Sequence, residues 1–331
     1  MSEERNDTNY SSMLDMLKDC LREVQVNVAK LEDVPGIASG FKMLDELTGG
    51  FEAGKVYVVG ARPAMGKMSF MLSIVRNIAI ETGPVLLFST NHRKSDYVFR
   101  LLSMYCNIPT LALRQGHLNK NEWERLDKGI ASLMSVPLFI HDSLDLPLDE
   151  LVETAHNCIA EKGIKIIFID CLQMMDFAKA DMTTSERMAK VMCTLKQLAY
   201  QTNLPVVVGA MMNRGVERRE GPSGKRPQLK DLENSCYIEK LADIVMMVHR
   251  PEYYQIFSDE KGRDLHGRME VIVMKNDLNP LGSVFLDYQE KTGWVSPIRD
   301  DIWKMSLRDF EHNNEAVRKL TRDFGLEEVP F

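Results

Sequence analysis

The sequence predicts an α/β fold in which a mostly parallel, twisted sheet carries helices on both faces. The main observation is that apolar runs of strand length alternate with amphipathic stretches of helical period, a pattern typical of parallel sheets. The runs lie at residues 56–60, 85–89, 137–140, 165–169, 205–210, 244–248 and 269–274. The second observation is that the first run leads into Ala61-Arg62-Pro63-Ala64-Met65-Gly66-Lys67, which has the spacing of a phosphate-binding loop and precedes a helical pattern.

Length, composition and charge are those of a globular protein with one large or two modest domains: 331 residues, 44% hydrophobic and 27% charged. The formal net charge of −7 gives no overall attraction to nucleic acid, so a DNA contact needs a local basic strip. No apolar run approaches the roughly 20 residues of a membrane span, and the acidic N-terminus is no signal peptide. We therefore expect a cytoplasmic protein without membrane contact. The six cysteines lack the paired spacing of a zinc site or a disulfide framework.

The ends of the chain differ from its middle. We expect the polar residues 1–10 to be disordered, and residues 11–34 to form an amphipathic linker helix because their apolar residues recur at helical spacing. This helix is either a packed cap or an arm that docks elsewhere, and the Pro35-Gly36 breaker before the domain at 35–295 favours the arm. The tail at 296–331 is predicted to be helical; packing on the domain is favoured over docking to a partner.

The loop predicts a binding site for ATP or another nucleoside triphosphate. In such a loop, backbone N–H groups and the N-terminus of the following helix point at the phosphates, while Lys67 reaches the terminal ones. A glycine-containing turn between strand and helix can also be purely architectural. The strand before the turn and the helix after it favour the nucleotide site. We expect the contacts to come from residues 61–67 together with Met68 and Ser69.

The metal half of this site is altered in the sequence. The position after Lys67 normally holds Ser or Thr, whose hydroxyl binds Mg²⁺. Here it is Met68, and a thioether is a poor ligand for a hard cation. Ligands in parallel sheets bind at the carboxyl ends of the strands, which places Asn91, Asp170 and Met211 along the same edge as the loop.

Further segments, in chain order, carry a resemblance to a known family. They are Gly40-Phe41, Leu44-Asp45, Thr48-Gly49-Gly50, the loop itself, Phe88-Ser89, 113–118, 169–173, 213–217, Lys225-Arg226-Pro227, Asp231-Leu232, Ile238-Glu239, 242–245 and 249–254. With these segments, the chain from about Ser11 to Trp294 resembles the C-terminal motor domain, with its linker helix, of DnaB-type replicative helicases. The family's N-terminal domain has no counterpart in the match.

The resemblance implies a RecA-like fold, a ring of subunits, ATP between neighbouring subunits and single-stranded DNA in the central channel. It assigns Lys67 to the phosphates and Asp170 to Mg²⁺ through the second shell of ligands. It also exposes departures. Asn91 stands at the position of the catalytic Glu, and Met211 at that of a Gln that senses the γ-phosphate. In the Lys-x-Arg finger, Lys275 remains but Asp277 replaces the cation.

The DNA-binding side departs from the family as well. The family's loop Asp-Leu-Arg-Glu-Ser-Gly reads 231–236 here as Asp-Leu-Glu-Asn-Ser-Cys, so a cation becomes an anion and a glycine gains a side chain. A cluster of basic residues remains and predicts either contact with DNA or a partner, or a solvated loop. Its members are Arg214, Arg218, Arg219, Lys225 and Arg226.

Three functions compete on this sequence. The chain is a working ring helicase, a catalytically degraded relative that binds nucleotide as a non-catalytic or regulatory subunit, or an ATPase that uses replacements such as Ser69 or Asp176. Substitutions on four separate catalytic segments, with the structural motifs between them intact, favour the degraded relative. Its candidate partners are further copies of itself, the subunits of an active helicase ring, and single-stranded DNA.

Overall fold

The computed structural model describes residues 13–14, 16–18, 21–22, 34–144, 146–175, 182–233, 235–277 and 279–298. The segment at 1–10 and the tail from residue 299 onward lie outside these residues, so the expectations for them remain predictions.

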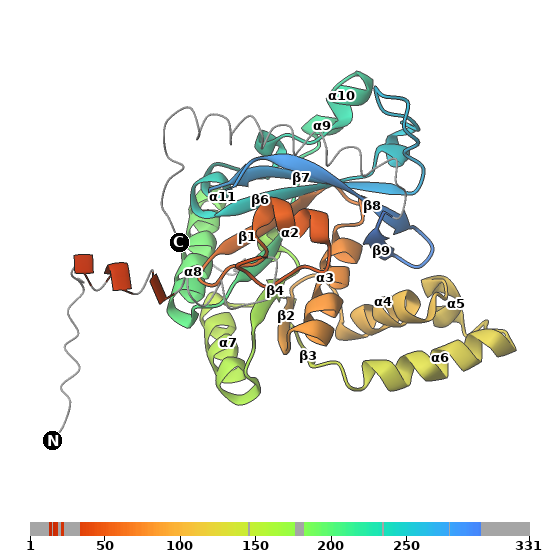
Figure 1. The fold of residues 1–331 in the computed structure, drawn as a ribbon, viewed down its shortest axis with the longest axis horizontal. Coiled ribbons are helices and arrows are strands. Elements are labelled where there is room, and N and C mark those ends of the chain that lie inside the picture. The colour runs from red at the N-terminus through yellow and green to blue at the C-terminus, as the bar shows by residue number, and fades with distance from the viewer. Residues whose placement is uncertain are drawn as a thin grey trace, which may run out of the picture.

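In the described part of the chain, one twisted sheet of nine strands forms the centre of the domain, in the order β3-β2-β4-β5-β1-β6-β7-β8-β9 (Figure 1). The first six strands in this order are parallel to their neighbours, and β7, β8 and β9 are added antiparallel at one edge. The strands are β1 (Val56–Ala61), β2 (Val85–Ser89), β3 (Leu138–Asp142), β4 (Ile166–Ile169), β5 (Val206–Met211), β6 (Ile244–His249), β7 (Arg268–Asn276), β8 (Gly282–Gln289) and β9 (Trp294–Pro297).

The seven predicted strands are all present, and their ends differ from the predicted ones by a residue or two. Strands β8 and β9 were missed. Along β8 buried and half-buried positions are mixed, because one face of this antiparallel edge is partly open to solvent, and such a strand has no continuous apolar run.

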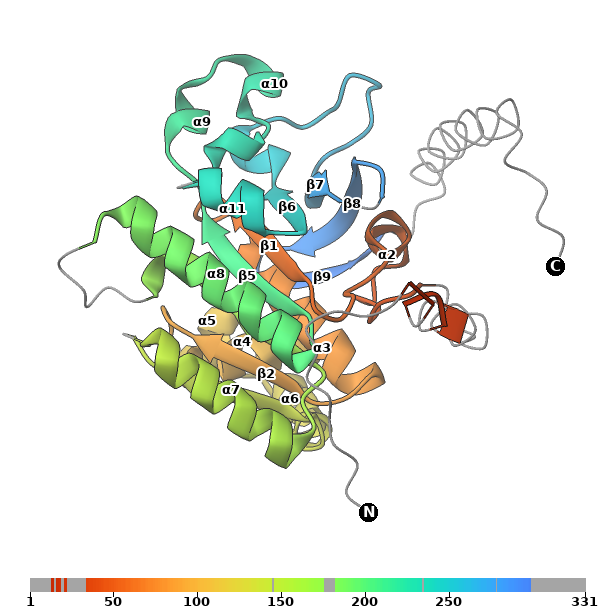
Figure 2. The ribbon, with the colours of Figure 1, turned by 90° about the vertical axis from the view of Figure 1, so that its left-hand side faces the viewer.

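Helices cover both faces of the sheet (Figure 2). Alternate residues of β1 point to opposite sides: Tyr57 and Val59 join one buried cluster, and Val56 and Val58 join the other. The first face carries α2 (Lys42–Thr48), α3 (Lys67–Glu81) and α4 (Lys94–Cys106), and the second carries α7 (Leu148–Lys162), α8 (Thr184–Thr202) and α11 (Ser235–Leu241). Two further helices, α5 (Thr110–Gln115) and α6 (Lys120–Leu133), pack against α4, and the short helices α9 (Gly215–Arg218) and α10 (Gly221–Lys225) follow β5.

The described residues of the linker segment are helical and lie apart from the body of the domain in Figure 1. Leu14, Leu17 and Leu21 expose 62%, 53% and 60% of their surface. Buried apolar side chains are what a packed cap requires, so this exposure agrees with the arm. No helix in the described part of the chain combines the length and apolar character that crossing a membrane requires.

The motif at residues 40–50 has a structural role. Phe41 and Leu44 are buried in the core, and the backbone N–H of Ser39 donates a hydrogen bond of 2.8 Å to the Asp45 carboxylate. At Gly50, φ is +76° and an added Cβ would lie 2.8 Å from the Ile37 carbonyl oxygen, so only glycine fits. These contacts fix the path by which the chain enters β1.

Asp45 makes the stability of this entry segment dependent on pH. Burial raises the pKa of Asp45 from 3.8 to about 6, against hydrogen bonds that lower it. A carboxyl whose folded pKa is raised contributes stability that is complete below pH 4 and is lost as the pH rises through 6. We expect the wild type to lose stability relative to Asp45→Asn between pH 4.5 and 7, which urea unfolding at several pH values would measure. The exposed Asp127→Asn on α6 is the control, and parallel profiles for wild type and Asp45→Asn would contradict the expectation.

Candidate nucleotide site

The phosphate loop joins β1 to α3 through a strained turn. Gly66 caps the 15-residue helix α3 with φ of 85°, and Ala64 also adopts a positive φ, 67°. The positive φ of Gly66 favours glycine, and an added Cβ would lie 2.6 Å from the terminal methyl of Met269, which would have to move. The loop therefore ends on a free helix N-terminus, where backbone N–H groups and the helix dipole favour an anion.

Two arginines hold the loop in this conformation. Arg250, at the end of β6, donates 3.1 Å to the Ala64 carbonyl oxygen and stacks on the Tyr288 ring at 4.4 Å. Arg62, inside the loop, donates 2.7 Å to the Met212 carbonyl oxygen and pairs with Glu217 at 2.7 Å. Contacts from residues just after β6 and β5 therefore fix the shape of the loop. The sequence assigned no role to Arg250, because nothing local shows that the ends of β1 and β6 are neighbours.

Lys67 and Asp170 come together as the sequence predicted. The Lys67 ammonium donates 3.0 Å to the backbone carbonyl oxygen of Asp170 at the end of β4. Burial lowers the pKa of Lys67, while the neighbouring Cys171 and Asp170 oppose that shift. On β5 an added Cβ at Gly209 would lie 2.8 Å from the Lys67 Nζ and 2.2 Å from the Asp170 oxygen, so a glycine makes this approach feasible.

The start of α3 presents no hydroxyl toward Asp170. Met68 is partly buried and packs against the core cluster on the α3 face of the sheet. Ser69 is 4% exposed, and an added Cβ at Gly293 would lie 2.9 Å from its Oγ. The Ser69 hydroxyl therefore faces the turn between β8 and β9. The Asp170 carboxylate instead accepts hydrogen bonds from Thr90 and Tyr97, two residues to which the sequence assigned no role.

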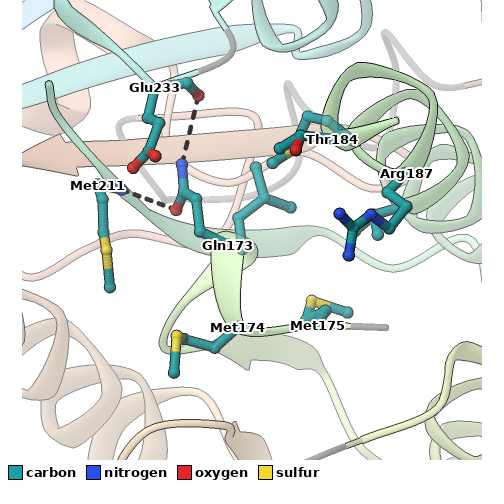
Figure 3. A pocket seen from close by; sticks show the side chains of 10 residues that line it. Gln173, Met174, Met175, Thr184, Arg187, Met211 and Glu233 are labelled. Atoms are coloured by element: carbon teal, nitrogen blue, oxygen red, sulfur yellow. Dashed lines mark hydrogen bonds between the residues drawn. The ribbon is translucent and has the colours of Figure 1, made fainter. Parts of the chain in front are cut away.

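Asn91 and Met211 lie at the edge of the sheet where they were predicted. Asn91 is exposed just after β2. Met211 ends β5, and its backbone N–H donates 2.8 Å to Gln173, whose amide in turn donates 3.4 Å to the Glu233 carbonyl oxygen (Figure 3). The Met211 side chain lines a mainly apolar pocket of about 250 Å³ with Met174, Met175 and Met188 among its neighbours. Thus neither side chain offers a general base.

Lys275 and Asp277 lie at the opposite end of the strands from the phosphate loop. Strand β7 runs antiparallel to β6, and Lys275 lies beside Val245 near the start of β6. The phosphate loop begins at Ala61, which lies beside Val248 near the other end of β6. The Lys275 ammonium donates 2.6 Å to the Ala242 carbonyl oxygen and lies 3.3 Å from the Asp277 carboxylate. The two residues therefore do not face the phosphate loop of their own chain.

The basic cluster divides into two groups. Arg219 pairs with Asp231 at 2.6 Å, Arg226 pairs with Glu270 at 2.8 Å, and Lys225 donates to a backbone carbonyl. Burial lowers the pKa of His249, which packs near Glu270, to about 4, so this histidine is neutral at pH 7 and adds no cation. The remaining two, Arg214 and Arg218, are exposed at α9. Those two are the cations best placed to meet a phosphate backbone, and their role in nucleic-acid binding stays a prediction.

Comparison with known proteins identifies relatives along most of the chain. Residues 36–295 match the model of the DnaB-like helicase C terminal domain. The chain is 33% identical over 290 residues to a probable replicative DNA helicase of Trieres chinensis, covering 87% of this chain and 62% of the relative. It is 30% identical over 284 residues to the replicative DNA helicase DnaC of Bacillus subtilis, covering 84% and 61%. The chain thus spans about three fifths of these relatives.

A solved structure agrees with the sequence matches. The ATPase domain of G40P superposes with a TM-score of 0.79 at 25% identity, covering 88% of this chain and 100% of that domain. The RecA-like α/β fold expected from the sequence is confirmed.

The site makes Lys67 the residue on which phosphate binding depends. We expect Lys67→Ala to weaken the binding of a fluorescent ATP analogue at least tenfold, because the substitution removes the buried cation beside the loop. Fluorescence titration would measure it, with Lys120→Ala, an exposed lysine at the start of α6, as the control. Equal affinities of the two variants would show that the loop does not hold the nucleotide.

Proposed function

The chain belongs to the family of the DnaB-like helicase C-terminal domain, and we propose that it binds ATP or another nucleoside triphosphate but has lost most of the catalytic residues. In this proposal it acts as a non-catalytic or regulatory subunit in DNA replication. One observation carries the proposal: Lys67 and the loop are arranged to bind phosphate, but the residues at the catalytic positions are not arranged for hydrolysis. Met68 packs on the core, Asn91 is exposed to solvent, and Asp277 lies beside Lys275 of the same chain.

Nucleotide binding is supported by the preformed loop. Its positive-φ residues are held by the two arginines, and the partly buried Lys67 lies beside them, so the groups that would contact phosphate converge on one place. The helix N-terminus after Gly66 supplies backbone donors that do not depend on side-chain chemistry.

Loss of hydrolysis is supported by the size of what is replaced. General-base catalysis contributes about 10²–10⁴-fold and an arginine finger about 10³–10⁵-fold. Asn91 has no carboxylate to take a proton, and Asp277 brings a negative charge where the finger brings a positive one. The lower limits of these two ranges multiply to a rate loss of about 10⁵-fold. Catalytic residues act as a unit, so the two losses do not simply multiply, and the comparison shows that the rate falls steeply.

An active ATPase with replacement residues is the alternative. The replacement by Ser69 is opposed by its position, because its hydroxyl lies against Gly293. Asp176 lies outside the described residues.

Assembly with neighbouring subunits is the second part of the proposal. An apolar groove of about 300 Å³ lies between α4, α6 and β3, and Met134 on its rim is 83% exposed. In Figure 1 the described part of the linker segment lies at the left, whereas α4 and α6, whose residues line the groove, lie at the lower right. We propose that the helix at 11–34 inserts into the groove of a neighbouring copy, or of a subunit in an active helicase ring. Such a ring would present Arg214 and Arg218 to single-stranded DNA.

The catalytic proposal predicts ATP turnover at background, with or without single-stranded DNA. A coupled phosphate-release assay on the wild type, Asn91→Glu and Lys67→Ala would measure it. Asn91→Glu restores one carboxylate only, so we expect at most a small increase. Robust wild-type turnover that disappears in Lys67→Ala would contradict the proposal and favour replacement residues.

The assembly proposal predicts a change in mass. We expect deletion of residues 1–31, or the single change Met134→Asp in the groove, to reduce the oligomer to a monomer with nucleotide affinity nearly unchanged. Light scattering would measure the mass of each protein, alone and mixed with a complete replicative helicase. Tyr200→Asp is the control, since Tyr200 is 81% exposed on α8, outside the groove. Equal masses for all variants would show that the helix covers its own subunit.

A further inference from the structure

The carboxylate of Asp170 already accepts three short hydrogen bonds from the protein. Oδ1 accepts a hydrogen bond of 2.9 Å from the backbone N–H of Thr90 and one of 2.7 Å from the Thr90 hydroxyl. Oδ2 accepts 2.5 Å from the Tyr97 hydroxyl and lies 3.4 Å from the Ser89 hydroxyl. A carboxylate has about four lone-pair positions, and three of them hold short hydrogen bonds here.

This arrangement is buried in the core of the domain. Asp170, Thr90 and Tyr97 are 1%, 0% and 1% exposed. The Tyr97 hydroxyl donates its proton to the carboxylate, and the backbone N–H and hydroxyl of Thr90 do the same. The ammonium of Lys67 lies 3.0 Å from the Asp170 backbone oxygen, and its positive charge helps to offset the negative charge of the carboxylate. A buried charge with this many donors is satisfied without an ion.

The residues present do not fit the Mg²⁺ ion that the family implies. Mg²⁺ requires near-octahedral oxygen ligands, usually several waters that must be held by free lone pairs. At this site Met68 presents a thioether, the Ser69 hydroxyl faces Gly293, and the Asp170 oxygens are engaged. Within the described residues, no group of three or more His, Cys, Asp and Glu side chains could hold a metal ion.

We infer that Asp170 acts as a hydrogen-bond anchor for strand β2 and helix α4, and that the phosphate loop holds its nucleotide without Mg²⁺. The inference rests on the proposed nucleotide binding. Thr90 follows β2, Asp170 follows β4, and Tyr97 lies in the first turns of α4, so one carboxylate joins three elements. Asn91 lies in the short bend that this anchor fixes at both ends.

The anchor also positions a surface away from the site. Val98, Leu101 and Leu102 follow Tyr97 on α4 and line the apolar groove. Asp170 is thus a positioning residue for α4, and Tyr97 and Thr90 act through it. Where an active motor would use this carboxylate on the ion, here the same carboxylate fixes the wall of the groove.

The first test is the dependence of nucleotide affinity on Mg²⁺. A fluorescent ATP analogue is titrated into the full-length protein in excess Mg²⁺ and in chelator, and we expect the two dissociation constants to agree within about twofold. A tenfold or larger loss in chelator would overturn the inference while leaving nucleotide binding intact. No binding in either buffer would overturn the proposed function as well, so the two failures are distinguishable.

The second test separates the anchor from the substitution at residue 68. Met68→Thr restores a hydroxyl at the position where the ion would bind, yet we expect its affinity to remain independent of Mg²⁺ because Asp170 stays engaged. A tenfold gain in affinity on adding Mg²⁺ to this variant would show that Met68 alone excludes the ion. That result would overturn the role given to Thr90 and Tyr97.

The third test measures the anchor itself. Tyr97→Phe removes one short hydrogen bond to a buried charge, and we expect the melting temperature of the full-length protein to fall by about 5 °C. Tyr105→Phe on the same helix is the matched control, because the Tyr105 hydroxyl is a buried group without a hydrogen-bond partner in the described structure. Equal melting temperatures for the two variants would overturn the anchor.

Discussion

The close approach of Lys67 to the end of β4 is the contact on which the site depends. The Lys67 ammonium donates a hydrogen bond of 3.0 Å to the Asp170 carbonyl oxygen. This bond joins α3, the helix after the phosphate loop, to β4, which is separated from β1 in the sheet by β5. Gly209 on the strand between them leaves the space for this contact. Because a buried ammonium requires a partner, the loop, the glycine and the end of β4 must occupy one arrangement together. A phosphate would then replace a backbone oxygen as the partner, with little movement of the fold.

Most of the fold follows from the apolar runs. The parallel strands β1, β2, β4, β5 and β6 are buried on both faces, so each appears in the sequence as a continuous apolar run. The half-buried β3 and the antiparallel β7, whose middle is buried, also appear as apolar runs. The last two antiparallel strands give no such signal, because β8 mixes buried and partly open residues. The entry motif at 40–50 was recognisable, but its purpose was not. Its purpose depends on contacts that only the folded chain shows. The Asp45 carboxylate accepts a hydrogen bond from the Ser39 backbone N–H, and Gly50 lies against the Ile37 carbonyl.

The site was predictable where one segment contains the chemistry, and unpredictable where several segments meet. The loop spacing locates Lys67, and the strand ends locate Asn91 and Met211. The support of the loop by Arg250 and the engagement of Asp170 by Tyr97 involve residues from separate strands and helices. The basic cluster shows the same limit. Arg219 and Arg226 are cations in the sequence, but buried acidic partners from other elements neutralise them.

The positions at which this chain departs from the family's motifs are ones where an exchange costs the fold little. Asn91 is exposed, Asp277 is exposed beside Lys275, and Met211 lines a pocket rather than the centre of the core. Exchanges at such positions leave no cavity and no unsatisfied buried group, so they cost little stability. Asp170 differs because its carboxylate is buried, and any residue there must satisfy Thr90 and Tyr97. In the role proposed here this carboxylate is required by the packing of β2 and α4, so its presence in the sequence does not by itself indicate metal chemistry.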